Sequence, residues 1–289
     1  MTYIDAFRDK AKDITSKIGI GLGDSTTHNI KILEATLEVL KFNRSSFFFF
    51  GRKKKIEKIA QNPLYKENKN TIFLIASEDP PSEIIKYLNN DLISCVVRGS
   101  LTSREFLKNL GTVLHVSEIN RLALLETNLG YQFFFGPVGI DECNNLENKK
   151  KFVQNALVLL SDLNIKPKIG VLSGGRLGDI GRNVDVDETI NEAEKLIDIF
   201  NIEKPKLEIK HFEILIEKAI KYKSNLVLAP NGISGNLIYR TLVHLGGGKA
   251  YGAIYMGIDY IIIDTSRVGD LSEIIGGYIL ALALSNRKN

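Results

Sequence analysis

The sequence contains only two cysteines and four histidines among its 289 residues. Cys95 and Cys143 form no Cys-x-x-Cys pair, and no histidine stands at metal-ligand spacing from a cysteine or another histidine. This usage argues against a disulfide framework and predicts that no metal is bound. Because unpaired cysteines are typical of proteins of the reducing cytosol, we expect a cytoplasmic location.

Long hydrophobic runs and an excess of one charge are also missing. The most apolar stretch, Ile274 to Leu284, is far shorter than the ~20 residues that a membrane-spanning helix needs. The charged N-terminal segment shows no signal-peptide pattern. The formal charge of +4 is small and dispersed, which disfavours a nucleic-acid partner. We therefore expect neither a membrane nor a nucleic acid as partner.

Nucleotide-binding motifs are scarce. No phosphate-binding loop of the form Gly-x4-Gly-Lys-Ser/Thr occurs. The segment GIGLG, with Gly19, Gly21 and Gly23, resembles the glycine-rich turn of nucleotide or S-adenosylmethionine sites. The next apolar run, FFFFG, is followed by Arg52 and Lys53, where an acidic residue would bind the ribose hydroxyls. The sequence therefore gives only weak support to an adenosyl site.

What the chain does contain is a regular alternation of strand-like and helix-like segments. Apolar runs of four to eight residues alternate with stretches such as TTHNIKILEATLEVL, in which apolar residues recur every three or four positions. This pattern predicts an α/β fold with largely parallel sheets, and the length predicts about two domains. We expect paired strands over 112–119 and 131–137, and a helix over 211–223.

Five predicted strand ends are rich in glycine, serine and arginine. They are GLGDSTTHN (21–29), RGSLTS (98–103), SGGRLGDIGRN (173–183), NGISGN (231–236) and DTSRVGD (264–270). Backbone N–H groups at the start of a helix bind anions, and the arginines Arg98, Arg176, Arg182 and Arg267 add forked donors suited to phosphate or carboxylate. One such loop is typical of a helix cap, but five together predict a polyanion-binding cleft.

Three segments resemble, in order, motifs of the phosphate acetyltransferases and phosphate butyryltransferases. They are VVRGSLTSREFL, IGVLSGGRLGD and APNGISGNLIYRTLVHLGGGKAYGAIYMGIDYIIIDTSRVGDLSEII. Within this superfamily the chain is most similar to the MtxX group of methanogens, also called methanogenesis marker protein 4. The resemblance implies the isocitrate/isopropylmalate dehydrogenase-like (phosphotransacetylase-like) fold, with two α/β domains around a cleft, and a homodimer. The implied domains are 1–111 with 253–289, and 112–252.

The resemblance also implies roles for individual residues. Ser266 and Arg267 match a serine and an arginine of the family's cleft, and Glu273 matches a proposed base, an aspartate in the acetyl-transferring relatives. Glu273 is equally typical of an acid in the first turn of a helix. The implied substrate- and phosphate-binding residues are Arg98, Gly99, Ser100, Ser173, Arg176, Gly178, Asn231, Ser234, Gly235 and Asn236.

Departures from the family pattern leave the function open. The segment RLGDIGRN lacks the Ser-Thr-Lys-Gly-Ser run of the acetyl enzymes, Arg98 replaces a serine or lysine, and only Arg104 or Lys108 could supply an additional cation. The first hypothesis is acyl transfer between phosphate and a thiol, with coenzyme A or an acyl phosphate as substrate and no covalently bound cofactor. The alternatives are a methyltransferase or methyltransferase-associated subunit, and a non-catalytic protein that senses a phosphorylated metabolite.

Overall fold

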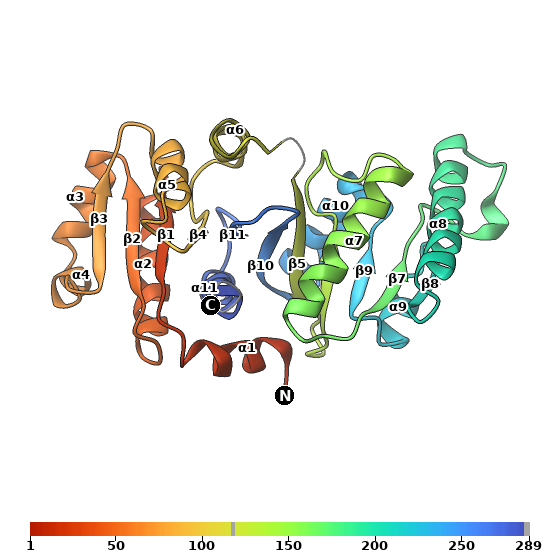
Figure 1. Ribbon diagram of the computed structural model, residues 1–289, viewed down its shortest axis with the longest axis horizontal. Helices are drawn as coiled ribbons and strands as arrows, with labels where there is room; N and C mark the ends of the chain where they lie inside the picture. The colour runs from red at the N-terminus through yellow and green to blue at the C-terminus, as the bar shows by residue number, and fades with distance from the viewer. Residues whose placement is uncertain (117–118, 286–289) are drawn as a thin grey trace. The chain divides into compact units, whose positions relative to one another are not determined.

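The computed structural model describes residues 1–116 and 119–285 and shows the predicted α/β architecture (Figure 1). The chain divides into two compact units. Unit 1 comprises Met1–Ile119 and Ala250–Asn289, and unit 2 comprises Asn120–Lys249. The domain boundaries expected from the sequence stay a prediction.

Unit 1 is built on a largely parallel sheet with the strand order β3-β2-β1-β4-β11-β10. Its strands are β1 (Lys17–Leu22), β2 (Ser46–Gly51), β3 (Ile72–Ala76), β4 (Cys95–Val97), β10 (Lys249–Met256) and β11 (Ile261–Asp264). Only the pairing of β10 with β11 is antiparallel among these. The parallel register places the carboxyl ends of β1, β2, β3, β4 and β11 at one edge of the sheet.

The helices of unit 1 pack on this sheet. They are α1 (Tyr3–Ala11), α2 (Thr26–Leu40), α3 (Lys53–Gln61), α4 (Pro63–Glu67), α5 (Pro80–Asn89), α6 (Ser103–Leu114) and α11 (Leu271–Ser285). The last helix packs against α1 and α2, while α5 packs against α6. Between α2 and α11, the Tyr278 hydroxyl lies 2.9 Å from that of Thr36, and both side chains are fully buried.

Unit 2 contains a second sheet segment with the strand order β5-β6-β9-β7-β8. Its strands are β5 (Asn120–Glu126), β6 (Gln132–Gly136), β7 (Lys168–Val171), β8 (Glu208–His211) and β9 (Leu226–Leu228). Its helices are α7 (Leu146–Asp162), the short η1 (Leu177–Asp179), α8 (Val184–Glu203), α9 (Ile216–Lys221) and α10 (Gly232–His244). Here β5 and β6 pair antiparallel, and the other pairings are parallel.

Two local predictions are wrong. The strand expected over 112–119 is helical up to Leu114, because Phe106 and Leu110 continue the buried face of α6; residues 117–118 lie outside the described part of the chain. The helix expected over 211–223 begins only at Ile216, since β8 precedes it. In β8 only Ile209 is buried, so this strand has no apolar run that the sequence could reveal.

Candidate functional site

The loop after β4 brings the first of the predicted residues to the carboxyl edge of unit 1. Gly99 has a φ of +63°, and a Cβ atom there would stand 2.3 Å from the carbonyl oxygen of Gly21. The Ser100 hydroxyl accepts the backbone N–H of Gly23 at 2.6 Å and donates to the side chain of Asn29 at 2.6 Å. Gly99 and Ser100 therefore fix the end of β1 and the start of α2.

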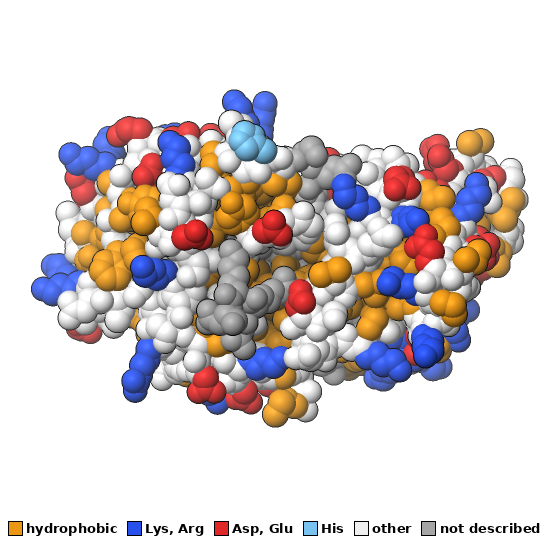
Figure 2. Space-filling view, in the orientation of Figure 1, with side chains coloured by type: hydrophobic (Ala, Val, Ile, Leu, Met, Phe, Trp, Pro, Cys, Tyr) orange, Lys and Arg blue, Asp and Glu red, His pale blue; other side chains and the backbone are white. Residues whose placement is uncertain are grey.

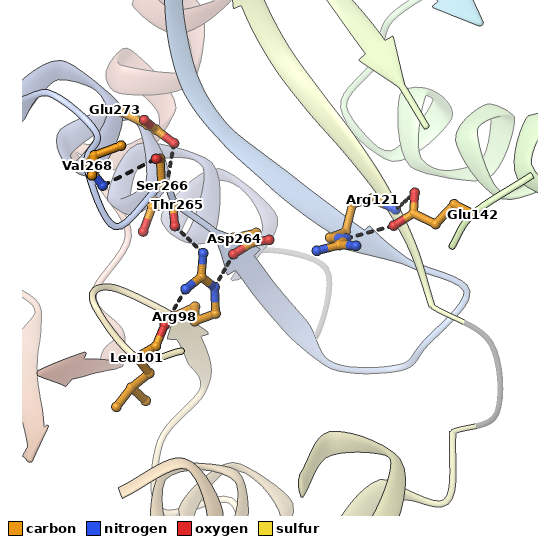
Figure 3. Close-up of polar contacts among 9 residues, drawn as sticks. All are labelled: Arg98, Leu101, Arg121, Glu142, Asp264, Thr265, Ser266, Val268 and Glu273. Atoms are coloured by element: carbon orange, nitrogen blue, oxygen red, sulfur yellow. Dashed lines mark hydrogen bonds and ion pairs between the residues drawn. The ribbon is translucent and has the colours of Figure 1, made fainter. Parts of the chain in front are cut away.

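Arg98 is buried and acts as a junction between two strand ends (Figure 3). Its guanidinium donates to the carboxylate of Asp264, to the carbonyl of Leu101, and to the carbonyl of Thr265 at 2.5 Å. These contacts join the end of β4 to the end of β11. The predicted role of Arg98 in binding phosphate stays a prediction, and its observed partners are groups of the protein.

Ser266 and Arg267 lie on the turn from β11 into α11, and Glu273 lies in the first turn of α11. Glu273 is 3% exposed and accepts the backbone N–H of Ser266 at 2.7 Å, while the Ser266 hydroxyl accepts the N–H of Val268 at 3.3 Å. The side chain of Arg267 is exposed. The buried carboxylate of Glu273 thus holds the backbone of the turn at Ser266, and the side chain of Arg267 faces solvent.

The glycines of the GIGLG segment are explained by packing inside unit 1. A Cβ atom at Gly21 would stand 2.2 Å from a methyl group of Leu101, and one at Gly23 would stand 2.1 Å from the carbonyl oxygen of Ser100. At Gly19 the nearest atom would belong to Ile93, at 2.5 Å. Because L-amino acids carry a Cβ, only glycine allows β1 to approach its neighbours this closely. The contacts account for all three glycines without a nucleotide.

The segment NGISGN forms the start of α10 in unit 2. Asn231 and Ser234 make a capping box, in which the Asn231 side chain accepts the N–H of Ser234 at 2.9 Å. A Cβ atom at Gly232 would stand 1.7 Å from the carbonyl oxygen of Gly139. These three residues therefore define how the helix begins.

The other two residues of that segment attach α10 to the loop after β6. A Cβ atom at Gly235 would stand 1.9 Å from the carbonyl oxygen of Pro137. The Asn236 amide donates to the carbonyl of Val138 at 2.8 Å. What approaches the glycines is therefore the backbone of the same unit, and ligand binding by Asn231, Ser234, Gly235 and Asn236 stays a prediction.

A histidine that the sequence did not single out lies beside Ser173 at the end of β7. The Nε2 atom of His211 lies 2.9 Å from the Ser173 hydroxyl, and its Nδ1 atom lies 2.5 Å from the carboxylate of Glu194 on α8. Ser173 is 1% exposed and also donates to the carbonyl of Gly175. The hydrogen-bonded chain of Ser173, His211 and Glu194 connects this loop to β8 and α8. The sequence did not reveal this contact, because its pattern predicts a helix over 211–223 and His211 is instead the last residue of β8.

The part of that loop from Arg176 to Arg182 is largely exposed. Asp179 accepts the N–H of Arg176 at 2.9 Å and pairs with Arg182, and these contacts hold the pKa of the Asp179 carboxyl below its ordinary value. A Cβ atom at Gly178 would meet nothing within 4 Å. The guanidinium groups of Arg176 and Arg182 therefore remain at the surface of unit 2.

A buried ion pair in unit 2 was also missed. Arg121 on β5 donates through Nε to Glu142 at 2.7 Å, and its backbone N–H donates to the same carboxylate at 3.2 Å (Figure 3). Burial raises the pKa of Glu142, and the charge and hydrogen bonds of Arg121 oppose that rise. The pair anchors the loop that carries Gly139, against which α10 begins.

The two cysteines, Cys95 and Cys143, are buried free thiols, and burial raises the pKa of Cys95 to about 11. Within residues 1–116 and 119–285, no three His, Cys, Asp or Glu side chains are grouped to hold a metal ion. No helix in the described part of the chain is both long and apolar enough to cross a membrane.

Comparison with known proteins shows relatives along the whole chain. No model of a protein family matches it. A protein of Methanosarcina mazei named "Putative methyltransferase mtx subunit X" is 36% identical over 283 residues, which are 98% of this chain and 95% of the relative. A protein of the same name from Methanosarcina barkeri is 35% identical and covers 96% of each chain.

Solved structures with the same fold include two phosphotransacylases. A branched-chain phosphotransacylase from Enterococcus faecalis is 16% identical, with a TM-score of 0.69 over 93% of this chain and 99% of its own. A phosphotransacetylase from Staphylococcus aureus is 17% identical, with a TM-score of 0.67 over 98% and 99%. Isocitrate dehydrogenase from Methylococcus capsulatus, 12% identical, aligns with a TM-score of 0.53 over 92% and 84%. The expected isocitrate dehydrogenase-like fold is confirmed.

Proposed function

Since the chain belongs to the family of the Methanosarcina mtx subunit X proteins and has the fold of phosphotransacetylases, we propose that it transfers an acyl group between phosphate and a thiol. The acyl donor is an acyl phosphate or a coenzyme A-type thioester, bound at the carboxyl edge of unit 1. The observation that carries the proposal is the turn after β11, where buried Glu273 holds Ser266 and leaves Arg267 exposed.

The chemistry assigns each residue of the turn a task. The thiol loses its proton and its sulfur attacks the acyl carbon, a carbon–sulfur bond forms, and the bond from that carbon to the phosphate oxygen breaks. Arg267 stabilises the negative charge on phosphate, and the Ser266 hydroxyl donates to the oxyanion that develops on the acyl carbon. A carboxylate such as Glu273 is the class of group that accepts the thiol proton.

The buried network beneath the turn supports this assignment by fixing its position. Arg98 holds the carbonyl of Thr265, which immediately precedes Ser266, and Glu273 holds the N–H of Ser266 itself. Both polar groups of the peptide bond between Thr265 and Ser266 are thus attached to buried charged groups. A catalytic turn needs such support because misplacement by about 1 Å costs on the order of 100-fold in rate.

The test is acyl exchange by the purified protein and by the variant Arg267→Ala. Acetyl, propionyl, butyryl and branched-chain acyl phosphates are offered with coenzyme A, and thioester formation is measured. Arg44→Ala is the matched control, because Arg44 is an exposed arginine that precedes β2 at the opposite edge of the sheet. We expect the Arg267 variant to weaken acyl-phosphate binding by about 1.5–3 kcal/mol, as loss of a charge-assisted hydrogen bond does. Equal exchange by both variants, or no exchange with any acyl group, contradicts the proposal.

Methyl transfer is the second candidate, because the names of the Methanosarcina relatives describe it. Against an adenosyl donor bound at GIGLG stands the packing of Gly21 and Gly23 against the loop after β4. A thermal-melt panel with S-adenosylmethionine, acetyl phosphate and coenzyme A separates the candidates. A ligand at about 100 times its Kd adds roughly 2.7 kcal/mol. A shift with S-adenosylmethionine alone favours methyl transfer, and binding of acyl phosphate without turnover favours a sensor.

A further inference from the structure

Lysines gather at the edge of the unit 2 sheet where its parallel strands begin. The strands β6, β9, β7 and β8 run parallel, so their amino ends meet at one edge. Figure 2 shows Lys and Arg side chains along the lower side of unit 2, near the position of α9 and β8 in Figure 1. All the lysines before or at the start of β7, β8 and β9 are exposed except Lys168, which is half-buried. They are Lys166, Lys168, Lys204, Lys206, Lys221 and Lys223.

Acidic side chains at this edge leave much of the lysine charge uncompensated. Glu203 pairs with Lys150 at 2.7 Å, and Glu208 pairs with Lys168 at 3.0 Å. Asp162 ends α7 at the same edge. The lysines of this edge that have no ionic partner within residues 1–116 and 119–285 are Lys166, Lys204, Lys206 and Lys221. The edge therefore presents a positively charged surface.

Two ammonium groups are held against one tyrosine ring. The Nζ atom of Lys168 lies 3.7 Å from the centroid of the Tyr222 ring, and the Nζ atom of Lys210 lies 4.4 Å from it. The Tyr222 hydroxyl donates to the carboxylate of Glu208 at 2.6 Å. Because the ring attracts both ammonium groups, their charges have fixed places before any partner arrives. Less side-chain entropy is then lost when a partner binds.

Lys223 occupies a backbone position that favours glycine. Its φ is +64°, in the left-handed region. Its N–H donates to the carbonyl of Ile220 at 2.9 Å, and the N–H of Ser224 donates to that of Ala219 at 3.0 Å, which is the Schellman ending of α9. The Nζ atom of Lys223 lies 4.7 Å from the centroid of the Tyr131 ring. A glycine would be less strained here but would carry no charge, so the position points to a use for the lysine's charge.

Exposed leucines adjoin this edge. Leu129 lies in the turn between β5 and β6, two residues before Tyr131, and is 90% exposed. Leu245, directly after α10, is 84% exposed. A Cβ atom at Gly247 would stand 3.6 Å from that of Asn128, so the two loops lie side by side. Apolar side chains beside charged ones are typical of a protein interface, in which polar groups surround an apolar centre.

The chemistry of this edge favours a carboxylate-rich protein over a nucleic acid or a lipid surface. Forked phosphate recognition uses arginine, and the cations named above are all lysines. Bases stack on open aromatic faces, whereas the rings of Tyr131 and Tyr222 are in contact with ammonium groups. Lipid headgroups are mobile, so ammonium groups held at fixed places suit carboxylates that are fixed as well. Such complementarity between two protein surfaces orients the partner and speeds association.

We propose that the amino edge of the unit 2 sheet binds a protein whose surface combines several carboxylates with an apolar side chain. The lysine ammonium groups pair with the carboxylates, and Leu129 and Leu245 contact the apolar side chain. Salt weakens the complex, because exposed ion pairs are screened. The inference does not rest on the proposed acyl transfer, whose residues lie in unit 1.

The test is fluorescence anisotropy of a labelled peptide of Glu-Glu-Leu repeats, titrated with the full chain at low salt. This peptide is expected to bind more tightly than one of Gln-Gln-Leu repeats. The double variant Lys221→Gln with Lys223→Gln is expected to weaken binding about fivefold or more, because two exposed ion pairs are lost. The matched control is Lys53→Gln with Lys54→Gln, which removes the same charge from exposed positions of α3 in unit 1 and should bind as the parent does.

The apolar contact is tested separately. Leu129→Ser is expected to weaken binding of the Glu-Glu-Leu peptide and to leave its salt dependence unchanged, since no charge is removed. Vesicles that contain phosphatidylserine and a single-stranded oligonucleotide are the competing polyanions, and both are expected to bind more weakly than the acidic peptide.

Four results would overturn the proposal. They are no binding of the Glu-Glu-Leu peptide at low salt, equally tight binding of the Gln-Gln-Leu peptide, equal losses in the two double variants, and tighter binding of the oligonucleotide or the vesicles. The last result would assign the edge to a nucleic acid or a membrane surface. A failure of acyl exchange with peptide binding intact would refute only the proposed function.

Discussion

The buried carboxylate of Glu273 accepts the backbone N–H of Ser266 at 2.7 Å, across the turn between β11 and α11. A carboxylate in this position holds the turn, and it is also the group that the resemblance implies as the base. The two roles make different demands on the side chain. An amide oxygen accepts an N–H as a carboxylate does, but it does not take a proton from a thiol.

Glu273→Gln separates these roles. If Glu273 only holds the turn, the glutamine variant retains acyl exchange and stability to within about 1 kcal/mol, whereas Glu273→Ala leaves the N–H of Ser266 without its acceptor and costs about 1–3 kcal/mol. Urea unfolding measures the stability of each variant, and the exchange assay measures its activity; together they distinguish the two roles of Glu273. A glutamine variant that binds acyl phosphate normally and has lost exchange would assign the base to Glu273.

Breaking the junction between β4 and β11 should destabilise unit 1 strongly. Arg98→Met removes a buried cation and leaves the carboxylate of Asp264 without it, which costs about 3–5 kcal/mol when a buried pair loses one partner. The free energy of unfolding in urea measures this. Arg104→Met is the comparison, because Arg104 is exposed on α6. A loss below about 1 kcal/mol in the Arg98 variant would show that the junction contributes little.

Two glycines predicted as ligand-binding residues should respond differently to alanine. In Gly235→Ala the new Cβ would stand 1.9 Å from the carbonyl oxygen of Pro137, so α10 or the loop must move, at a cost of about 1–3 kcal/mol or more. In Gly178→Ala the Cβ meets open space, and stability should change by about 0.5 kcal/mol or less. Thermal unfolding of both variants provides the measurement. Similar melting temperatures would mean that the contact at Gly235 is relieved cheaply.

Acidification should weaken the fold through His28. Its side chain is buried, and burial together with the charges of Lys31 and Arg98 lowers its pKa below the ordinary value. The unfolded chain therefore binds the proton more tightly, so this contribution to stability is complete above about pH 6.5 and declines as pH falls toward the folded pKa. His28→Leu should lose less stability than the parent between pH 7 and pH 5. Parallel pH curves would exclude His28 as the source.

Segments with a regular apolar pattern were predictable from the sequence, and buried segments with polar residues at their ends were not. The helix over Thr26–Leu40 follows directly from its apolar period, and the strand over Ser46–Gly51 follows from its run of phenylalanines. By contrast, β5 begins with Asn120 and Arg121 and ends with Glu126, so its polar ends conceal a strand that is buried throughout. The ion pair with Glu142 allows Arg121 to be buried there, and a local sequence pattern cannot reveal an ion-pair partner 21 residues away.

The candidate site shows the same division. The order of motifs along the chain was enough to place Ser266 and Arg267 on one turn at a strand end. It could not show that Gly235 meets the backbone of Pro137, or that His211 lies against Ser173, because both contacts join segments that are distant in sequence. A glycine in the sequence indicates that some atom comes close to the backbone, but not whether that atom belongs to a ligand or to another part of the chain.

The junction of Arg98 with Asp264 links residues 166 positions apart, and this spacing has a consequence for biosynthesis. When β4 leaves the ribosome, the strand that will cover its open edge has not been made, and the whole of unit 2 is translated first. At about 5–20 residues per second the wait is on the order of 10–30 s. During that interval Cys95, Val96 and Val97, all buried in the finished protein, form an unpaired apolar edge. Unit 1 is thus completed only after unit 2 has been translated, and until β11 is made the unpaired edge of β4 is open to pairing with a strand of another chain.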